Sequence, residues 1–506
     1  MGEYLSPAVY VEEVSSGAKP IAGAGTSTGA FVGIAEVGPI NQATLITNWT
    51  QFVNTFGSFI ADGYLAYSVF QFFNEGGTKC YVVRVVSDAA TASVAGNIKD
   101  STGAEVLKVE AVSPGRAGNN ISVEIAAATD EVAGHFNLLV KKNELVNGSM
   151  TAVLKESFVN LSMLEMDNGL PNAAHVEAMI NDSSAYIRVE DLNSDARPAN
   201  GTHKLAGGED KLEDVDFIGD EAKKTGLHAF DTVDDINIVA IPDKAGDREV
   251  ILSAMTYCQN RADCFFVADC GLAMDPAMVR EFKEGKGTWA GENAFNSSFG
   301  ALYYPWIKVA DPLSGTTKLT PPSGAIVGTY SSCDVKRGVH KAPAGTVEGY
   351  LNSAMGIERI VTKGEHDTLN PVGVNVIRAF PGTGICVWGA LTTTTDAEWK
   401  YVNVRRLFLF LEESIDEGTQ WVVFEPNDPS LWGSVNRNIT AFLTRVWRDG
   451  ALFGKTPDEA FFVKIDEENN PPAVRDAGQL IIEIGVAPVK PAEFVIIRIQ
   501  QKTLTK

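Results

Sequence analysis

The sequence predicts an α/β (α+β, multidomain) protein, with an α/β core, an inserted β-rich domain and tethered strands at both ends. Apolar runs of strand length alternate with amphipathic helical patterns over much of the chain. Short alternating runs separated by turn signals fill residues 93–205. A chain of 506 residues exceeds one ordinary core, so two to four domains are expected.

The chain begins with a strand on a tether. Val9 and Val11 alternate with Tyr10 and a glutamate within residues 4–14, which is the period of a β-strand. Residues 15–29 are rich in Gly, Ala, Ser and Thr and predict a flexible linker. A strand placed in this way either frays, folds back or pairs with another subunit.

An α/β pattern follows and is then interrupted. Residues 30–36 and 80–86 predict buried strands, and an amphipathic helix is expected at 64–74 between them. The interruption is the β-rich stretch, which is expected to be inserted into an α/β domain whose halves lie on either side. Its predicted elements are strands at 105–112, 121–127, 136–141, 156–159 and 185–190, and a helix at 173–181.

The α/β pattern then resumes. A strand at 236–241, a helix at 248–260 and a strand at 264–268 have the spacing of a parallel sheet. Residues 301–309 and 324–330 continue this unit. Apolar segments at 376–379 and 385–389 lead into the C-terminal part.

Residues 403–463 predict two amphipathic helices that flank a short apolar strand, with a second strand after them. With Arg437 placed at zero and roughly 100° per residue, Arg445 and Arg448 fall at about 80° and about 20°. The opposite side, at about 140–200°, is apolar; it holds Val435, Ile439, Phe442 and Val446. This helix therefore has one face for a core and one basic face.

The chain ends with more strands. Residues 480–484 predict a strand, 487–491 a proline spacer, and 493–500 a strand of high β-propensity. The apolar residues of this last strand are Phe494, Val495, Ile496, Ile497 and Ile499. Left unpaired, such a strand invites aggregation. It therefore either folds back or completes the sheet of another subunit.

Composition excludes several classes of function. A net charge of −22 argues against nucleic-acid binding, which needs concentrated positive charge. The six cysteines form no C-x-x-C pair, so reduced core thiols are expected rather than a metal site. No apolar run spans a membrane, and no signal-peptide pattern opens the chain. No P-loop occurs, and we expect no cofactor and no nucleotide hydrolysis.

Blocks spread over most of the chain resemble the contractile tail sheath proteins of bacteriophages, tailocins and extracellular contractile injection systems. The matching blocks are SPAVYVEEV, PGRAGNNISVEI, DINIVAIPD, ALYYPWIKVAD, PPSGAIVGTYSSCDVKRGVHKAPAG, NVIRAFPGTGICVWGALT and RVWRDGALFGKTPDEAFFV. With this resemblance, the expected parts are an N-terminal arm and linker, a first core part, an inserted outer domain, a central subtilisin-like but non-catalytic domain, a C-terminal core domain and a C-terminal arm. Their expected ranges are 1–29, 30–92, 93–205, 206–375, 376–486 and 487–506.

The resemblance implies a structural role. Sheath subunits stack as rings into a helical sleeve around an inner tube and contract to drive the tube through a target envelope. Implied partners are the chain itself, the inner tube protein, and baseplate and tail-terminator proteins, with no nucleic acid and no membrane insertion. The implied location is the cytoplasm during assembly and then the finished particle.

The resemblance also assigns residues. The terminal arms exchange strands with neighbouring subunits, through Val9, Tyr10, Val11, Phe494, Val495, Ile496, Ile497 and Ile499. Arg437, Arg445 and Arg448 are expected to contact the tube, and the alternative is a solvated helix face. Charge contacts of this kind can hold a tube in register and then all break together during contraction.

Two competing functions remain. One is a strand-swapped scaffold that does not contract. The other is a subtilisin-like hydrolase, for which His228, His340 and His366 are available. The G-x-S-x-G match at 25–29 (GTSTG) lies in the predicted linker rather than at a strand-to-helix turn, and subtilisin-type motifs are absent from the expected regions, so we expect no catalysis. No catalytic or metal-binding residue is assigned.

Overall fold

The computed structural model describes residues 20–146, 149–167, 170–493 and 496. The strand expected at Val9, Tyr10 and Val11 lies outside these residues, as do Phe494, Val495, Ile497 and Ile499 of the last strand. The chain forms two compact units. The larger unit comprises Ser27–Val335 and Pro343–Val402, and the smaller unit comprises Met1–Thr26, Lys336–Ala342 and Asn403–Lys506. This division does not test the six expected ranges, which stay predictions.

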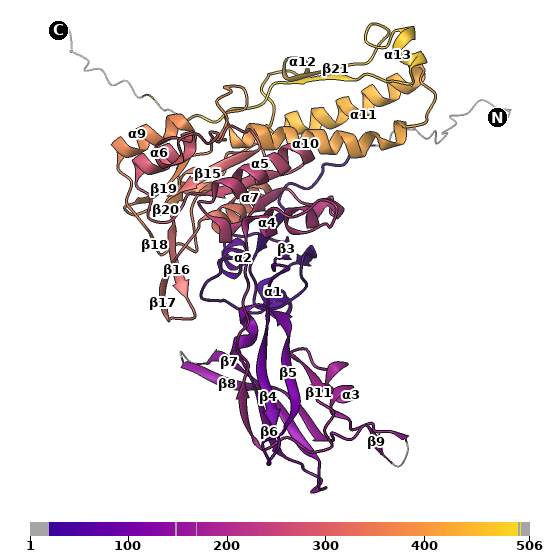
Figure 1. The fold of residues 1–506 in the computed structure, drawn as a ribbon. Coiled ribbons are helices and arrows are strands. Elements are labelled where there is room, and N and C mark those ends of the chain that lie inside the picture. Colours follow the sequence, from indigo (N-terminus) through magenta and orange to yellow (C-terminus); the bar gives the residue numbers. More distant parts are fainter. Residues whose placement is uncertain (1–19, 147–148, 168–169, 494–495, 497–506) are drawn as a thin grey trace, which may run out of the picture. The chain divides into compact units, whose positions relative to one another are not determined.

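An eight-stranded sheet forms the core of the larger unit, in the order β2-β3-β1-β13-β14-β15-β19-β20 (Figure 1). From β3 to β19 every neighbouring pair is parallel, so the predicted parallel sheet is confirmed. The bounds are β1 Gly29–Gly33, β2 Thr44–Ile46, β3 Cys80–Arg84, β13 Ile238–Ala240, β14 Phe265–Asp269, β15 Gly300–Tyr304, β19 Val374–Phe380 and β20 Gly384–Val387. Residues 301–309 form two strands, β15 and β16 (Ile307–Asp311), because Pro305 has no N–H for a ladder.

The helices of this unit are α1 Trp49–Phe56, α2 Leu65–Asn74, α4 Asp214–Ile218, α5 Arg248–Arg261, α6 Pro276–Glu284, α7 Ser323–Arg337, α8 Gly345–Glu348 and α9 Lys363–Leu369. Helix α7 is buried at every residue from Ser323 to Asp334. It approaches α2 closely because two glycines face it. A Cβ on Gly324 would lie 2.3 Å from the Cα of Ser68, and a Cβ on Gly328 would lie 2.6 Å from the carbonyl of Phe72.

Two buried carboxylates hold the N-termini of α2 and α7. Asp243 accepts from the backbone N–H groups of Ile34 and Tyr64. Asp269 Oδ1 accepts from the N–H of Ser323 at 2.8 Å. Burial raises the pKa of Asp243 to about 6 and that of Asp269 to about 7, because a charge is poorly solvated there. These carboxylates lie at the carboxyl edge of the parallel sheet, where α/β enzymes bind ligands. Here they accept hydrogen bonds from backbone N–H groups of the protein itself.

The β-rich stretch forms two sheets around one core, in the orders β11-β5-β4 and β12-β6-β7-β8. Its elements are β4 Ala92–Lys99, β5 Glu105–Pro114, β6 Ile121–Ala127, β7 Phe136–Val146, β8 Ser149–Leu161, β9 Met166–Asp167, β10 Leu170–Pro171, α3 Val176–Asn181, β11 Ile187–Asp191 and β12 Gly201–Lys204. The predicted strands and helix are confirmed. Lys142 of β7 pairs with Glu36 of the α/β core at 3.0 Å, and Arg84 of β3 donates to Ser113 Oγ at 2.8 Å.

A small sheet, β17-β16-β18, completes the larger unit; β17 is Thr316–Thr320 and β18 is Gly356–Ile357. Short 3-10 turns connect the elements at Arg116–Asn120, Gly226–Thr232, Pro242–Lys244, Gly287–Trp289 and Asn370–Val372. All six cysteines are buried and free, as the sequence predicted.

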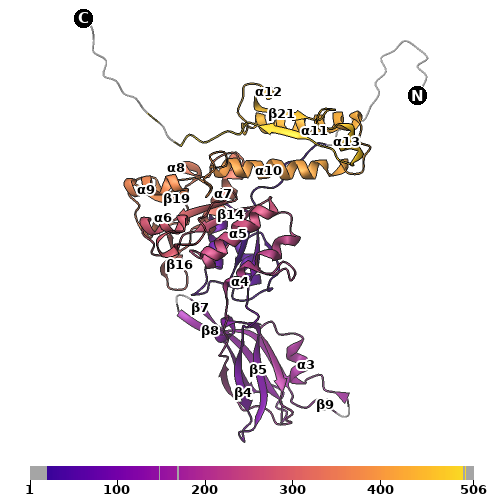
Figure 2. The ribbon, with the colours of Figure 1, turned by 45° about the horizontal axis from the view of Figure 1, so that its top comes forward.

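The smaller unit packs two long helices against a two-stranded antiparallel sheet (Figure 2). Its elements are α10 Val402–Thr419, η6 Gln420–Val422, α11 Pro429–Arg448, α12 Pro457–Ala460, β21 Phe461–Lys464, α13 Pro472–Asp476 and β22 Glu483–Val486. Its core includes Ile21 and Val339, which are far from the helices in sequence. No helix among the described residues is long and apolar enough to cross a bilayer.

Two strand predictions in this unit are wrong. The short apolar segment at 421–424, between the two helices, is not a strand: Gln420–Val422 form a 3-10 turn, the next two residues continue as a turn, and Phe424 is fully exposed at φ +69°. Four apolar residues favour a strand, but the segment has no strand beside it. Of residues 480–484, only the last two belong to β22. The N–H of Ile481 donates to Asn470 Oδ1 at 2.7 Å, so this N–H bonds a side chain and not a neighbouring strand.

Candidate functional site

Helix α11 separates an apolar face from a basic face, as predicted. Asp428 caps it, accepting from the N–H of Leu431 at 2.8 Å, and Pro429 follows at the first helical position, where it costs no hydrogen bond. The apolar face is buried; it includes Val435, Ile439, Phe442 and Val446. This face packs on α10 and the sheet, so the position of the opposite face is fixed.

The three arginines of the basic face differ in what they contact. Arg437 is exposed and donates to Ser434 Oγ at 3.0 Å. Arg448 is exposed and makes no hydrogen bond or ion pair with any described residue. Arg445 donates to the backbone carbonyl of Ile21 and lies over the Phe442 ring, 5.9 Å from its centroid. Only Arg448 therefore has no bonding partner among the described residues, whereas Arg437 bonds within its own helix and Arg445 holds the N-terminal segment.

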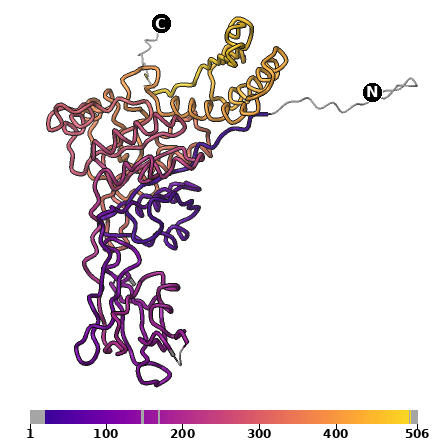
Figure 3. The backbone as a smooth tube through the Cα atoms, turned by 45° about the vertical axis from the view of Figure 1, so that its right-hand side comes forward, coloured from indigo at the N-terminus to yellow at the C-terminus, as the bar shows by residue number. Residues whose placement is uncertain are grey.

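The N-terminal segment runs along α10 from Ile21 to Thr26 (Figure 3). The N–H of Ala24 donates to Ser414 Oγ at 2.9 Å, and Arg406 donates to the Thr26 carbonyl at 2.7 Å. Ile21 is 1% exposed. The flexible linker predicted for 15–29 is therefore wrong over this part. The signal that sequence reasoning missed was the lone isoleucine in a run of small residues.

The sheet of the smaller unit has an open edge, which the hydrogen bonds identify. The N–H of Ala487 donates to the Ala460 carbonyl at 2.8 Å, and the N–H of Val489 donates to the Ala451 carbonyl at 3.1 Å. The N–H and C=O groups of successive residues point to alternate sides of a strand. Those of Ile484 and Val486 therefore point away from β21, to the other edge of β22. No described strand pairs with that edge.

The other outer edge, along β21, is partly covered. Asn436 of α11 donates its Nδ2 to the Val463 carbonyl at 3.2 Å. The chain beyond β22 is held at Val489, whose carbonyl accepts from Asn403 Nδ2 at 3.3 Å. Ile496, the one described residue of the predicted exchange strand, is 78% exposed. Both arms therefore leave from anchored points on the smaller unit.

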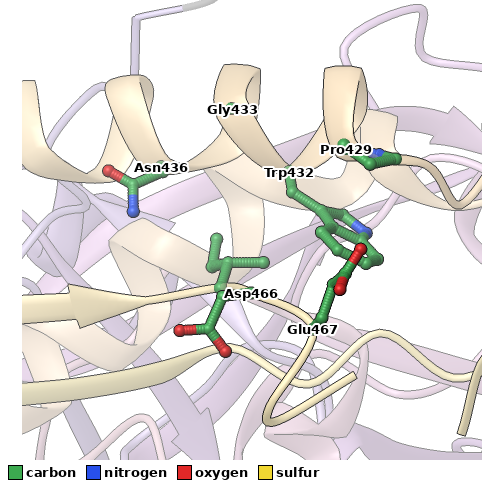
Figure 4. A pocket seen from close by; sticks show the side chains of 7 residues that line it. Pro429, Trp432, Gly433, Asn436, Asp466 and Glu467 are labelled. Atoms are coloured by element: carbon green, nitrogen blue, oxygen red, sulfur yellow. The ribbon is translucent and has the colours of Figure 1, made fainter. Parts of the chain in front are cut away.

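A cleft of about 370 Å³ opens between α11 and the chain after β21 (Figure 4). Trp432 and Ile465 give it an apolar lining, and the Glu467 carboxylate points toward Trp432. The Asp466 carboxylate points away from α11 and accepts from the N–H groups of Glu468 at 2.9 Å and Asn469 at 3.3 Å. No lysine or arginine among the described residues pairs with these two acids, whereas the neighbouring Glu468 pairs with Lys464 at 2.6 Å. The cleft thus combines an apolar floor with unpaired negative charge.

The three histidines considered for catalysis lie on separate elements: at the Gly226–Thr232 turn, after α7 and in α9. His228 Nδ1 lies 3.2 Å from Asp231 Oδ2, and no serine of the described chain bonds its ring. The carbonyl of His340 accepts from Asn403 at 2.8 Å. His366 begins the last turn of α9. No three His, Cys, Asp or Glu side chains of the described part gather as metal ligands.

Comparisons with known proteins agree on one family. The family model described as the phage tail sheath protein central domain matches residues 221–393, and that described as the phage tail sheath C-terminal domain matches 394–502. The tail sheath protein of Vibrio phage KVP40 is 28% identical over 186 residues, 37% of this chain and 27% of that protein. That of Burkholderia phage BcepMu is 27% identical over 220 residues, 41% of this chain and 44% of the relative. The chain thus matches less than half the length of these relatives.

Solved structures share the fold over nearly the whole chain. The sheath of PVC, an extracellular contractile injection system, in its contracted state has a TM-score of 0.60 at 22% identity, covering 99% of each chain. The contracted helical sheath of the anti-feeding prophage has a TM-score of 0.58 at 23% identity, covering 99% of this chain and 100% of that one. The sheath tail protein of Desulfitobacterium hafniense has a TM-score of 0.59 at 14% identity, covering 91% and 94%. Because the two family models together match residues 221–502, more than half of the chain, the chain belongs to the phage tail sheath family, which consists of structural proteins rather than enzymes.

Proposed function

We propose that this chain is the subunit of a contractile sleeve, which polymerises as stacked rings around an inner tube and contracts to drive that tube through a target envelope. The observation that carries the proposal is the open edge at Ile484 and Val486, beside two anchored arms. A two-stranded sheet is marginal alone, and a strand from another copy completes it by β-addition. The donors are the arm strands at Val9–Val11 and Phe494–Ile499.

The partners follow from this arrangement. Copies of the chain link through their arms, and a repeated head-to-tail contact that does not close gives a helical polymer. The inner tube contacts Arg437, Arg445 and Arg448, and baseplate and terminator proteins bind the two ends. Assembly takes place in the cytoplasm, before the particle is complete. The chain carries no P-loop, so contraction releases free energy stored in a metastable lattice.

Expression of the full chain tests polymerisation directly. Negative-stain microscopy is expected to show hollow tubes. Val486→Pro removes an N–H that points to the open edge, so it is expected to stop polymerisation while circular dichroism shows a folded subunit. The matched variant Gly485→Pro removes an N–H that faces β21 and is expected to unfold the smaller unit. Prolines at Val495 and Ile497 block the donated strand without touching the described fold. Tubes that form with these tail prolines contradict C-terminal strand donation.

A further inference from the structure

The cleft beside Trp432 has a complementary segment in this same chain. The last six residues are QKTLTK, a stretch with two lysines and no acid in a chain of net charge −22. In an extended strand, side chains two apart point the same way. Lys502, Leu504 and Lys506 therefore share one side, as an apolar side chain between two cations. The cleft offers an apolar floor with the Glu467 carboxylate beside it.

We propose that the C-terminal tail of a second copy seats in this cleft, with Leu504 against Trp432 and Ile465 and with one of its two lysines, Lys502 or Lys506, toward Glu467. The inference rests on the proposed strand exchange and names a second contact of the same tail. Burial of one leucine and one ion pair with Glu467 add to the strand's own backbone bonds. The tail thereby acts as a latch on the copy that receives it.

The lengths of the two segments agree with this placement. The receiving strand runs from Glu483 to Val489, which is as long as the donated strand from Phe494 to Gln500. If the donated strand lies antiparallel to β22, its end reaches the end of the sheet where β22 begins. There β21 leads directly into Ile465, Asp466 and Glu467. The remaining six residues span about 20 Å, and two strand spacings are about 10 Å.

The sequence before the tail disfavours a turn back to the chain's own cleft. After Val489 the sequence reads KPAE, with no glycine or asparagine for a tight hairpin turn. Pro488 and Pro491 favour extended backbone. The described residue Ile496 is 78% exposed and so packs on nothing nearby. These features direct the tail away from the unit that carries it.

Cross-linking between two separate chains tests the contact. The six native cysteines are all buried, so only the introduced cysteines are expected to form the cross-link. One chain carries Leu504→Cys and the other Gly433→Cys, a cleft position where a Cβ meets only the end of the Arg437 side chain at 3.5 Å. Oxidation of mixed tubes is expected to give a disulfide-linked pair about a hundredfold faster than the control Asp449→Cys, because docking raises the local concentration to the millimolar range.

Each outcome decides a distinct question. Tubes without the cross-link overturn the tail–cleft contact and leave the proposed function standing, whereas absence of tubes from the unaltered chain removes the proposed function itself. Fast cross-linking of a Gly433→Cys/Leu504→Cys chain as a dilute monomer shows that the tail serves its own cleft and also overturns the inference.

A binding measurement needs no assembly. A labelled peptide of residues 494–506 is expected to bind the full chain lacking its own tail, followed by fluorescence anisotropy. A Lys502→Glu/Lys506→Glu peptide is expected to bind about tenfold more weakly, and Glu467→Lys in the chain is expected to restore its binding. Equal binding of both peptides contradicts the proposed pairing of charges.

Discussion

The guanidinium of Arg445 donates a hydrogen bond to the backbone carbonyl of Ile21, 424 residues away in the sequence. A face that the sequence predicted for the inner tube therefore also fixes the origin of the N-terminal arm. Contact with the tube and anchoring of the N-terminal arm predict different consequences of substitution. Substitutions of Arg445 and Arg448 separate the two roles, because Arg448 contacts no described partner.

We expect Arg445→Ala to loosen the segment from Ile21 to Thr26. A charge-assisted bond at an exposed site contributes about 1 kcal/mol, which is about fivefold in the population of the opened segment. Limited proteolysis with mass spectrometry is expected to show about fivefold faster cleavage in this segment. Arg448→Ala is the control and is expected to leave cleavage unchanged; equal acceleration in both variants would mean that the bond to Ile21 contributes nothing.

The tube contact is tested with Arg437→Glu/Arg448→Glu, which leaves the bond to Ile21 intact. Charge reversal is expected to permit sheath polymerisation but abolish tubes inside the sleeves, because like charges then face the partner. Electron microscopy of sheath and tube proteins expressed together measures the filled fraction. The charge-matched control is Lys99→Glu/Lys204→Glu on the β-rich stretch. Straight, filled particles from the arginine variant would show that the basic face is only solvated.

Close packing of α7 on α2 predicts that Gly324→Ala destabilises the larger unit by about 1–3 kcal/mol. The added methyl group meets the backbone of Ser68 at 2.3 Å, which cannot rotate away as a side chain can. Gly364→Ala in α9 is the control, because nothing lies within 4 Å of its Cβ position. Thermal unfolding is expected to show a lower midpoint for the first variant and an equal or slightly higher one for the second.

The raised pKa of Asp269 predicts that stability falls as pH rises. The unfolded carboxyl loses its proton near pH 4, whereas burial holds the folded pKa at about 7. Between these values the folded state binds more protons, so the free energy of unfolding decreases with rising pH, at most on the order of 1 kcal/mol per pH unit. Asp269→Asn is expected to flatten this dependence.

Denaturant titrations between pH 6 and pH 7.5 isolate the effect, because Asp243, with a pKa of about 6, contributes mainly below that range. Asp88→Asn is the control, since that side chain is fully exposed. An unchanged slope in Asp269→Asn would show that Asp269 is charged in the folded protein at neutral pH.

Contraction without nucleotide is the prediction that bears on the energy source. Extended sheaths are expected to contract on mild denaturant or heat with no ATP added, because relaxation of a metastable lattice needs only passage over a barrier. Sheath length in micrographs is the measurement, and buffer-only sheaths are the control. A strict requirement for ATP in the isolated particle would contradict stored lattice energy.

Local patterns predicted much of the fold, and long-range contacts explain the rest. The spacing of Val435, Ile439, Phe442 and Val446 fixed both faces of α11, because burial follows the helical period. The strand predicted at 421–424 was wrong, because apolar content favours a strand only when another strand pairs with it. No local pattern pointed to the bond between Arg445 and Ile21 or to the open edge at β22, since both depend on which distant segments meet.

The anchoring of both arms on one unit has a mechanical consequence. Ile21 is bonded to α11 through Arg445, and Val489 is bonded to α10 through Asn403. In a polymer linked by its arms, a pull entering at Ile21 passes through these two helices and leaves at Val489. The covalent path, by contrast, runs through the whole eight-stranded sheet. If subunits are linked through their arms as proposed, tension between neighbours takes this short route through side-chain bonds and largely bypasses the sheet.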